Sequence, residues 1–129
     1  MITREIQIGK LVLGGKNPVR IQSMTNTNTM DTVATVLQAL ALVDAGCELV
    51  RITARNIAEA ENLKSIKIAL AKRNCFVPLI ADIHFQPQAA IVAARIVEKH
   101  DGMLQYQTLP GHGTTFGVVL PREINDTDL

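Results

Sequence analysis

The sequence predicts an α/β fold in which parallel strands alternate with helices as a partial TIM-barrel-like sheet, followed by a C-terminal β-hairpin. Segments rich in apolar residues, suited to buried strands, begin near residues 19, 48 and 77, an even spacing of about 29 residues. A segment with helical periodicity follows each of them, so a strand–helix unit repeats three times. Parallel strands must be joined by crossover connections, and these helical segments can provide them. Two architectures fit this repeat: an open doubly wound sheet, or part of a (β/α)₈ barrel.

Each expected element carries local signals at its ends. Alternating apolar residues on either side of Gly9-Lys10 predict a short N-terminal hairpin. Asp31 and Asn56 are placed to cap the first two helices, and Gly46 to end the first of them. We expect strands over 18–23, 48–53 and 77–83, and a third helix over 87–99.

Composition places the chain among ordinary globular domains. It has 129 residues, of which 47% are hydrophobic and 19% charged, with a net charge of +1. Near-neutral charge and the absence of Trp give no reason to expect nucleic acid or an anionic membrane as a partner. No apolar run reaches the roughly 18 residues of a membrane span and the N-terminus shows no signal peptide, so we expect a cytoplasmic protein. Cys47 and Cys75 form no CxxC motif and are expected to be small core residues.

Polar and ionisable residues gather at the carboxyl ends of the three expected strands. In chain order they are Gln22, Ser23, Thr25, Asn26, Arg51, Asp82 and His84. Parallel α/β folds build their pockets at this edge of the sheet, from the loops that follow the strands. We therefore expect these side chains to share one pocket.

Arg51 sits in a mostly apolar strand and needs a partner there, because an unpaired buried charge is costly. An internal carboxylate such as Glu48 or Asp82 could pair with it. Alternatively, a ligand phosphate could, since guanidinium binds phosphate in a bidentate manner. The spacing favours neither.

Asp82 and His84 are alternate residues and would point the same way in a strand. The carboxylate could orient the imidazole, or the two could share a metal, although no third ligand is visible. A buried pair that completes the strand is the simpler interpretation. The polar run 25–29 likewise has two interpretations: an anion cradle, or a turn that bonds to itself.

Three motifs carry a resemblance to a known family: "LGGKNPVRIQSMTNTNTMDTVATVLQ", "DAGCELVRIT" and "VPLIADIHF". Over about residues 3–99 the chain resembles the N-terminal barrel portion of the 4-hydroxy-3-methylbut-2-enyl diphosphate synthase (GcpE) family. That family is an oxidoreductase of non-mevalonate isoprenoid biosynthesis, with a TIM-type barrel and a separate iron–sulfur domain. It reductively opens 2-C-methyl-D-erythritol 2,4-cyclodiphosphate.

The resemblance implies a diphosphate substrate held by Arg51, with Asp82 and His84 in the same pocket. By the same resemblance Gln22, Ser23, Thr25 and Asn26 would face the substrate. A 4Fe-4S cluster is expected only in the full-length family, whose cysteine ligands have no counterpart here. We therefore expect a fragment that binds no cofactor, contributes no catalytic residue and is inactive alone, with open sheet edges that favour homo-oligomers.

Residues 96–121 resemble the C-terminal end of sensor histidine kinase ATPase domains. The string "IVEKHDGMLQYQTLPGHGTTFGVVLP" carries this likeness, and its glycine-rich turn would place Gly111, Gly113, Thr114 and Thr115 near nucleotide phosphates. The alternative function is thus an ATP-binding fragment, although the other kinase motifs are absent and the same residues also make a plain hairpin. We expect a join near Lys99-His100, with a partial barrel over 1–99 and a kinase-like hairpin and tail over 100–129.

Overall fold

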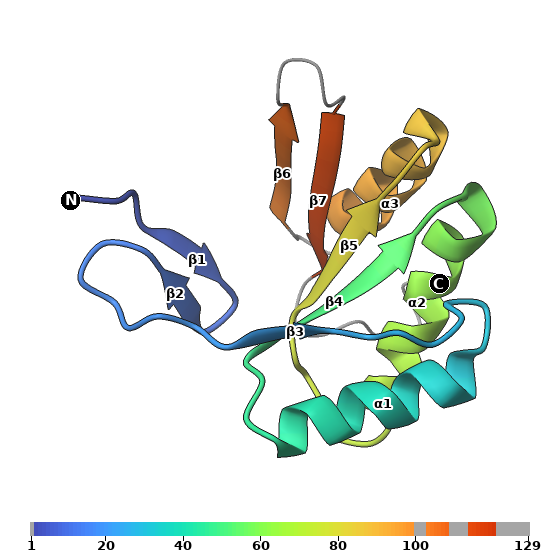
Figure 1. Ribbon diagram of the computed structural model, residues 1–129, viewed down its shortest axis with the longest axis horizontal. Coiled ribbons are helices and arrows are strands. Elements are labelled where there is room, and N and C mark those ends of the chain that lie inside the picture. The colour runs from blue at the N-terminus through green and yellow to red at the C-terminus, as the bar shows by residue number, and fades with distance from the viewer. Residues whose placement is uncertain (1, 100–102, 109–113, 121–129) are drawn as a thin grey trace.

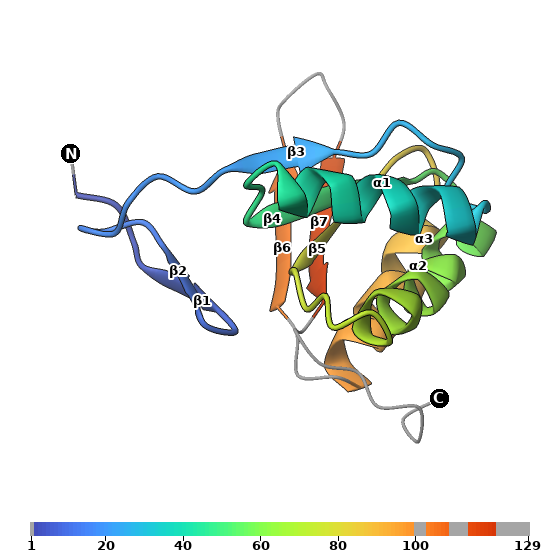
Figure 2. The ribbon, with the colours of Figure 1, turned by 90° about the horizontal axis from the view of Figure 1, so that it is seen from below.

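The computed structural model describes residues 2–99, 103–108 and 114–120, and its main feature is a five-stranded sheet with helices against one face (Figure 1). The strands are β1 (Ile6–Ile8), β2 (Leu11–Leu13), β3 (Gln22–Met24), β4 (Leu49–Ala54), β5 (Leu79–Ile83), β6 (Met103–Thr108) and β7 (Thr114–Leu120). The helices are α1 (Thr32–Asp44), α2 (Ile57–Ala71) and α3 (Pro87–Lys99). Figure 2 shows all three helices on one side of the sheet and the β1–β2 hairpin set apart from it.

The parallel strand–helix repeat is confirmed. The sheet order is β3-β4-β5-β7-β6, and β4 pairs in parallel with both β3 and β5. The predicted first strand is shorter than expected, because only Gln22–Met24 forms β3. The predicted N-terminal hairpin is present as the antiparallel pair β1–β2.

The predicted C-terminal hairpin is present, and it joins the sheet through its second strand. β7 lies antiparallel beside β5, and β6 lies outside β7. The compositions suit this order, since the apolar-rich "TTFGVVL" is flanked by strands on both sides while the glutamine-containing "MLQYQT" forms the edge.

Alternation along β4 and β5 separates a buried face from a polar one. Val50, Ile52 and Ala54 of β4 are fully buried against the helices, as is Leu79 of β5. The residues between them point to the other face, against which none of the described helices packs. This second face holds Arg51 and Thr53 of β4 together with Ile80 and Asp82 of β5, and it is where a TIM barrel has its interior.

The β1–β2 hairpin, although a separate sheet, contacts the amino-terminal end of this second face through a small apolar cluster. Ile8 is buried with Leu49 in a small apolar cluster, and Leu11 and Ile80 pack against it. The opposite end of the face, at the carboxyl ends of the strands, is therefore the end available to a ligand.

Both predicted helix caps are confirmed. Asp31 Oδ1 accepts a hydrogen bond from the Ala34 N–H at 3.1 Å, and Asn56 Oδ1 accepts one from the Glu59 N–H at 2.8 Å. Gly46, just past the end of α1, has a φ of 108°, a conformation that side chains rarely adopt. The two N-caps fix where α1 and α2 begin, and Gly46 fixes where α1 ends.

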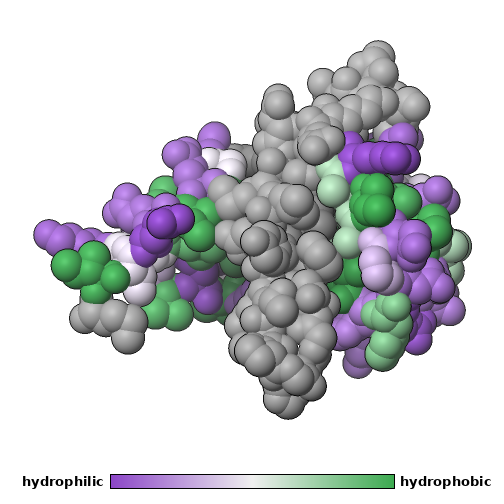
Figure 3. Space-filling view, turned by 90° about the horizontal axis from the view of Figure 1, so that it is seen from above, coloured by the Kyte–Doolittle hydropathy of each residue, from purple (hydrophilic) through white to green (hydrophobic). Residues whose placement is uncertain are grey.

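Apolar side chains are exposed around the β3 edge and the N-terminal segment. Ile2, Val19 and Ile21 are 99%, 95% and 57% exposed. Figure 3 shows hydrophobic patches among hydrophilic ones at the hairpin end of the molecule. Within the residues described, no helix is long and apolar enough to cross a membrane.

Candidate functional site

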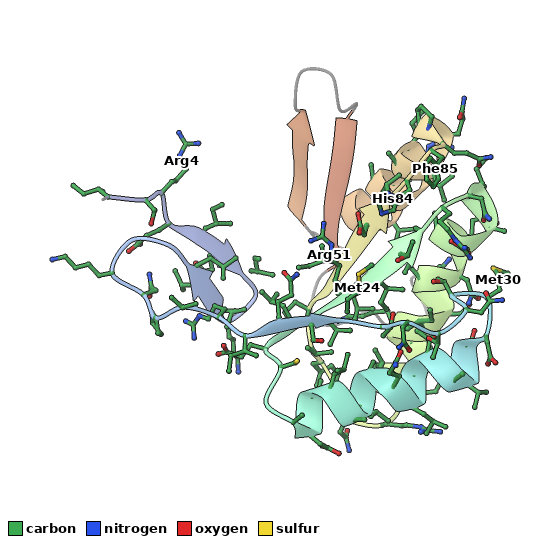
Figure 4. The ribbon with its side chains drawn as sticks, in the orientation of Figure 1. Arg4, Met24, Met30, Arg51, His84 and Phe85 are labelled. Carbon is green, nitrogen blue, oxygen red and sulfur yellow. The ribbon has the colours of Figure 1, made fainter. Side chains whose placement is uncertain are left out.

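Arg51, Asp82 and His84 meet on the polar face of the sheet. Arg51 Nε lies 3.3 Å from Asp82 Oδ2, and His84 Nε2 lies 3.1 Å from the same oxygen. The parallel register of β4 and β5 explains why these side chains meet. Thr53 of β4 pairs with Asp82 of β5, and Arg51 lies two residues before Thr53. Arg51 and Asp82 therefore lie on the same face of the sheet. Figure 4 shows Arg51 on the same side of the sheet as Met24, with His84 at the end of β5.

The charged carboxylate of Asp82 is more deeply buried than the two side chains that contact it. Asp82 is only 7% exposed, whereas the side chains of Arg51 and His84 are 34% and 41% exposed. Asp82 Oδ1 and Arg51 Nε are both buried, and among the described residues neither has a hydrogen-bond partner. Buried polar atoms without partners are rare in folded proteins and draw attention to a binding group.

The structure settles which internal carboxylate faces Arg51. Asp82 does, while Glu48 instead lies 3.2 Å from Arg20 Nη1 and accepts a 2.9 Å hydrogen bond from the Ile21 N–H. That backbone hydrogen bond, with help from Arg20, lowers the pKa of Glu48 against the opposing effect of burial. Glu48 therefore secures the start of β3, and the guanidinium of Arg51 remains on the open face.

The four residues predicted at the end of the first strand do not lie together. Gln22 pairs with Leu49 and shares the polar face, but Ser23 pairs with the buried Val50 and so lies on the helix-covered face. The structure thus does not bring Ser23 together with Arg51. Thr25 is 6% exposed and donates its N–H to the Arg51 carbonyl at 3.0 Å, and Asn26 exchanges two hydrogen bonds with Gln38 of α1.

The polar loop after β3 lines a cavity of about 310 Å³, and Arg51, Asp82 and His84 are not among its lining residues, although Thr53 in its wall pairs in register with Asp82. Its lining residues are Thr25, Asn26, Thr27, Asn28, Thr29, Thr53 and Arg55. Several of the loop's groups are already bonded: Thr29 Oγ1 donates to the Thr53 carbonyl at 2.7 Å, and Asn28 Oδ1 accepts from the Met30 N–H at 2.9 Å. The loop is therefore a self-bonded turn that also forms a polar wall.

Arg55 at the mouth of this cavity is held by Glu59. The closest contact joins Arg55 Nη2 to Glu59 Oε1 at 2.7 Å, and the Arg55 N–H donates to Glu59 Oε2 at the same distance. Burial works to raise the pKa of Glu59, but these hydrogen bonds and the Arg55 charge together lower it. Glu59 correspondingly raises the pKa of Arg55. The pair fixes the loop that follows β4.

The predicted nucleotide-binding residues lie largely outside the described part of the chain. Gly111 and Gly113 fall outside it, while Thr114 and Thr115 begin β7, of which the structure gives the backbone alone. The antiparallel pairing of β6 with β7 is the hairpin expected there. It is compatible with both interpretations of this segment.

The thiols do not match an iron–sulfur site. Such clusters take four cysteine thiolates, and the sequence has two cysteines. Cys75 is buried and Cys47 partly buried, both in the apolar core beside a cavity of about 430 Å³ at the other end of the strands. Among the described residues, no three His, Cys, Asp or Glu side chains are grouped as metal ligands.

Two residues at the site were missed by the sequence patterns. Met24 pairs with Arg51 in register, and it is 40% exposed on the same face. Phe85 follows His84, is 91% exposed and has a φ of 65°, unusual for a residue other than glycine. Its ring centroid lies 5.7 Å from that of His84, as Figure 4 allows the reader to follow. An unusual φ leaves no reliable trace in a single sequence.

Comparison with known proteins gives one consistent result. A family model described as the GcpE TIM-barrel domain matches residues 3–112. A protein of Bacteroides thetaiotaomicron named 4-hydroxy-3-methylbut-2-en-1-yl diphosphate synthase (flavodoxin) is 57% identical over 97 residues, which are 75% of this chain and 16% of that protein.

Relatives of the same name in other bacteria match this chain with similar identity and coverage. The protein of Akkermansia muciniphila is 52% identical over 98 residues, 76% of this chain and 17% of its own length. That of Leptospira interrogans is 50% identical over 97 residues, 75% of this chain and 15% of its own length. The chain thus spans about a sixth of the length of these relatives.

Proposed function

Because this chain belongs to the GcpE TIM-barrel family, we propose that it is an N-terminal barrel fragment of a 4-hydroxy-3-methylbut-2-enyl diphosphate synthase and forms part of a diphosphate-binding site. The relatives are named as synthases of 4-hydroxy-3-methylbut-2-en-1-yl diphosphate, and the reaction would be the reductive ring opening of 2-C-methyl-D-erythritol 2,4-cyclodiphosphate. The fragment would work in the cytoplasm as part of isoprenoid biosynthesis.

The observation that carries the proposal is the position of Arg51. The Arg51 side chain is one-third exposed on the face of the sheet opposite the described helices, in the middle of β4, where it pairs in register with Ile80. The ion pair with Asp82 engages one side of the guanidinium, which leaves its other donors for an anion. Charge-assisted bonds from arginine to phosphate are among the strongest in proteins.

The neighbouring residues would play supporting parts. Gln22 shares the face of Arg51, and Thr25 and Asn26 line the cavity of the loop after β3. Ser23, which lies on the other face, would act only through the backbone of β3. These assignments make the loop a wall of the site rather than its main anion cradle, because its own side chains are mostly bonded to each other.

We propose no turnover by this chain alone. Reduction of the cyclodiphosphate needs an electron source, and two cysteines in the core cannot supply the four thiolates of a cluster. Binding is therefore the activity to test.

We also propose a boundary near residue 99, between the partial barrel and a hairpin of separate origin. The parallel repeat gives way to the antiparallel β6–β7 hairpin at this point, which supports a change of origin there. The family match nevertheless continues to residue 112. We propose that the hairpin serves to cover the free edge of β5, where the next barrel strand would otherwise pair.

Calorimetric titration with the cyclodiphosphate tests the binding function. The full chain should bind it, and Arg51→Ala should weaken binding at least tenfold, since a charge-assisted hydrogen bond contributes about 1.5–3 kcal/mol. Arg73→Ala is the matched control, because Arg73 is exposed at the opposite end of the strands. No heat with the unaltered chain, or equal affinity after Arg51→Ala, would contradict the proposal.

A further inference from the structure

We propose that Cys47 and Cys75 form a thiol pair that a hydroperoxide oxidises to a disulfide, at the amino-terminal end of the strands. This modification site is independent of the proposed function, because it uses neither Arg51 nor the loop after β3. The disulfide would join the segment that follows α1 to the segment that follows α2, and so fasten the first strand–helix unit to the second.

The two cysteines occupy equivalent positions after α1 and α2. Each directly follows a residue with a positive φ, which is Gly46 at 108° for Cys47 and Asn74 at 57° for Cys75. Each also donates its backbone N–H to the carbonyl five residues earlier, at 3.0 Å in both cases. The same C-terminal turn therefore delivers a cysteine from each helix towards the start of the next strand.

The parallel register of β4 and β5 brings these two positions onto neighbouring chains. Val50 of β4 pairs with Leu79 of β5. Counted back along both chains, Cys47 lies three residues before Val50, and Cys75 lies four residues before Leu79, so the two cysteines are within one residue of level. Neighbouring strands lie about 4.8 Å apart, a separation that suits residues linked by a disulfide.

Both thiols line the cavity of about 430 Å³ at this end of the strands. Cys75 is buried and Cys47 is partly buried, and both pack with the main apolar core. The lining also includes the exposed residues Asp44, Arg73 and Asn74, so the cavity is open to solvent. A molecule as small as a peroxide can therefore reach Cys47, while burial shields Cys75 from direct attack.

A disulfide fits this thiol pair better than a metal ion does. Among the residues that the structure describes, no three His, Cys, Asp or Glu side chains are grouped as metal ligands. A partly accessible thiol beside a buried one is instead the arrangement of an oxidisable cysteine with a resolving cysteine.

The oxidation balances with hydrogen peroxide as the oxidant. The sulfur of Cys47 attacks one peroxide oxygen, the O–O bond breaks, and a sulfenic acid and a water molecule form. The sulfur of Cys75 then attacks the sulfur of Cys47, the S–O bond breaks, and the hydroxyl leaves with the Cys75 proton as a second water. The two thiols lose two electrons and two protons, and the peroxide takes up both.

Peptide mapping of the full chain tests the proposal. The reduced chain is treated with hydrogen peroxide at low protein concentration and digested without reduction. We expect one pair of peptides joined through Cys47 and Cys75, which dithiothreitol separates. A link between two copies of Cys47, or Cys47 oxidised to a sulfinic acid while Cys75 stays a thiol, would overturn the proposal.

The two single variants serve as matched controls for each other. In Cys75→Ala the peroxide should leave Cys47 as a sulfenic acid that dimedone traps, because the resolving thiol is absent. In Cys47→Ala the buried Cys75 should remain a thiol under the same treatment. Equal dimedone labelling of the two variants would contradict the assignment of the accessible and the resolving cysteine.

A further measurement on the unaltered chain does not depend on how the variants fold. Phenylarsine oxide bridges two neighbouring thiols, since two S–As bonds form and its oxygen leaves as water. Mass spectrometry of the intact, unoxidised chain should show one phenylarsenic group retained after dilution, and dithiothreitol should remove it. A chain that retains none would show that the two thiols are not neighbours and would overturn the proposal.

Discussion

Arg51 Nε and Asp82 Oδ2 face each other at 3.3 Å across neighbouring parallel strands, on the side of the sheet that no helix covers. Asp82 is nearly buried, and Arg51 is one-third exposed. An ion pair so placed satisfies the buried carboxylate in part and leaves the arginine accessible. The contact between Arg51 and Asp82 therefore stabilises the fold and also positions Arg51 for an anion. Substitutions at these two residues should distinguish the effect on stability from the effect on binding.

The first prediction concerns stability. Arg51→Ala should destabilise the fold by roughly 1–2 kcal/mol, because it leaves the buried Asp82 carboxylate without its cation. Urea unfolding measures this value. The double variant Arg51→Met/Asp82→Leu should recover most of the loss, since both charges are removed together. A double variant less stable than Arg51→Ala would contradict this view of the pair.

The second prediction concerns acid stability. Because the folded pKa of Glu59 is lowered from 4.5, its contribution to stability is fully present above about pH 4.5 and is lost as the pH falls through the folded pKa. Glu59→Gln should therefore lose less stability on acidification than the unaltered chain does. Urea unfolding at a series of pH values measures the difference.

The control for this series is Glu61→Gln, an exposed position on the same helix. Its acid dependence should follow that of the unaltered chain. If Glu59→Gln and Glu61→Gln gave the same curve, the contact between Arg55 and Glu59 would not be the source of the effect.

The third prediction concerns Phe85. The φ of 65° at Phe85 is a strained backbone conformation for a residue that carries a side chain. Because the residue is 91% exposed, its ring adds little hydrophobic stabilisation. Phe85→Gly should therefore raise stability by about 1 kcal/mol, seen as a higher urea midpoint. Asn74, with a φ of 57°, is the matched position, and Asn74→Gly should gain less because asparagine tolerates this conformation. A lower urea midpoint for Phe85→Gly would contradict this prediction and show that contacts of the ring stabilise the fold.

The fourth prediction concerns association through the β3 edge. This strand pairs on one side only within the described sheet, and Val19 and Ile21 are exposed beside it. We expect the chain to self-associate there, and Ile21→Lys to shift the mass measured by light scattering towards the monomer, because a charge on an edge disfavours pairing. Leu37→Lys, at an exposed position on α1, is the control. An unaltered chain that is monomeric at high concentration would contradict this prediction.

The sequence predicted most of the elements because their signals are local. The Asp31 and Asn56 caps, the glycine after α1 and the even strand spacing each depend on a few neighbouring residues. Side-chain alternation predicted that Asp82 and His84 point the same way, the gathering of polar residues at the strand ends added Arg51, and the structure brings the three side chains together. Ser23 was assigned to the same pocket because its neighbours were, although strand alternation sends Gln22 and Ser23 to opposite faces.

Long-range choices could not be predicted in this way. The sequence left Glu48 and Asp82 equally eligible as partners of Arg51, and register decides between them. It also did not reveal that β7 rather than β6 would pair with β5, because both segments are competent strands. The burial of Glu59 under Arg55 depends on how α2 packs, which no local pattern encodes.

The most direct test of the central claim is an NMR titration of the labelled chain with inorganic pyrophosphate. If the strand ends form an anion site around Arg51, saturable shifts should centre on the Arg51 side-chain N–H and on His84, and extend to Thr25 and Asn26. Shifts centred on Cys47 and Arg73 at the opposite end of the strands, or no saturable shifts at all, would contradict the account.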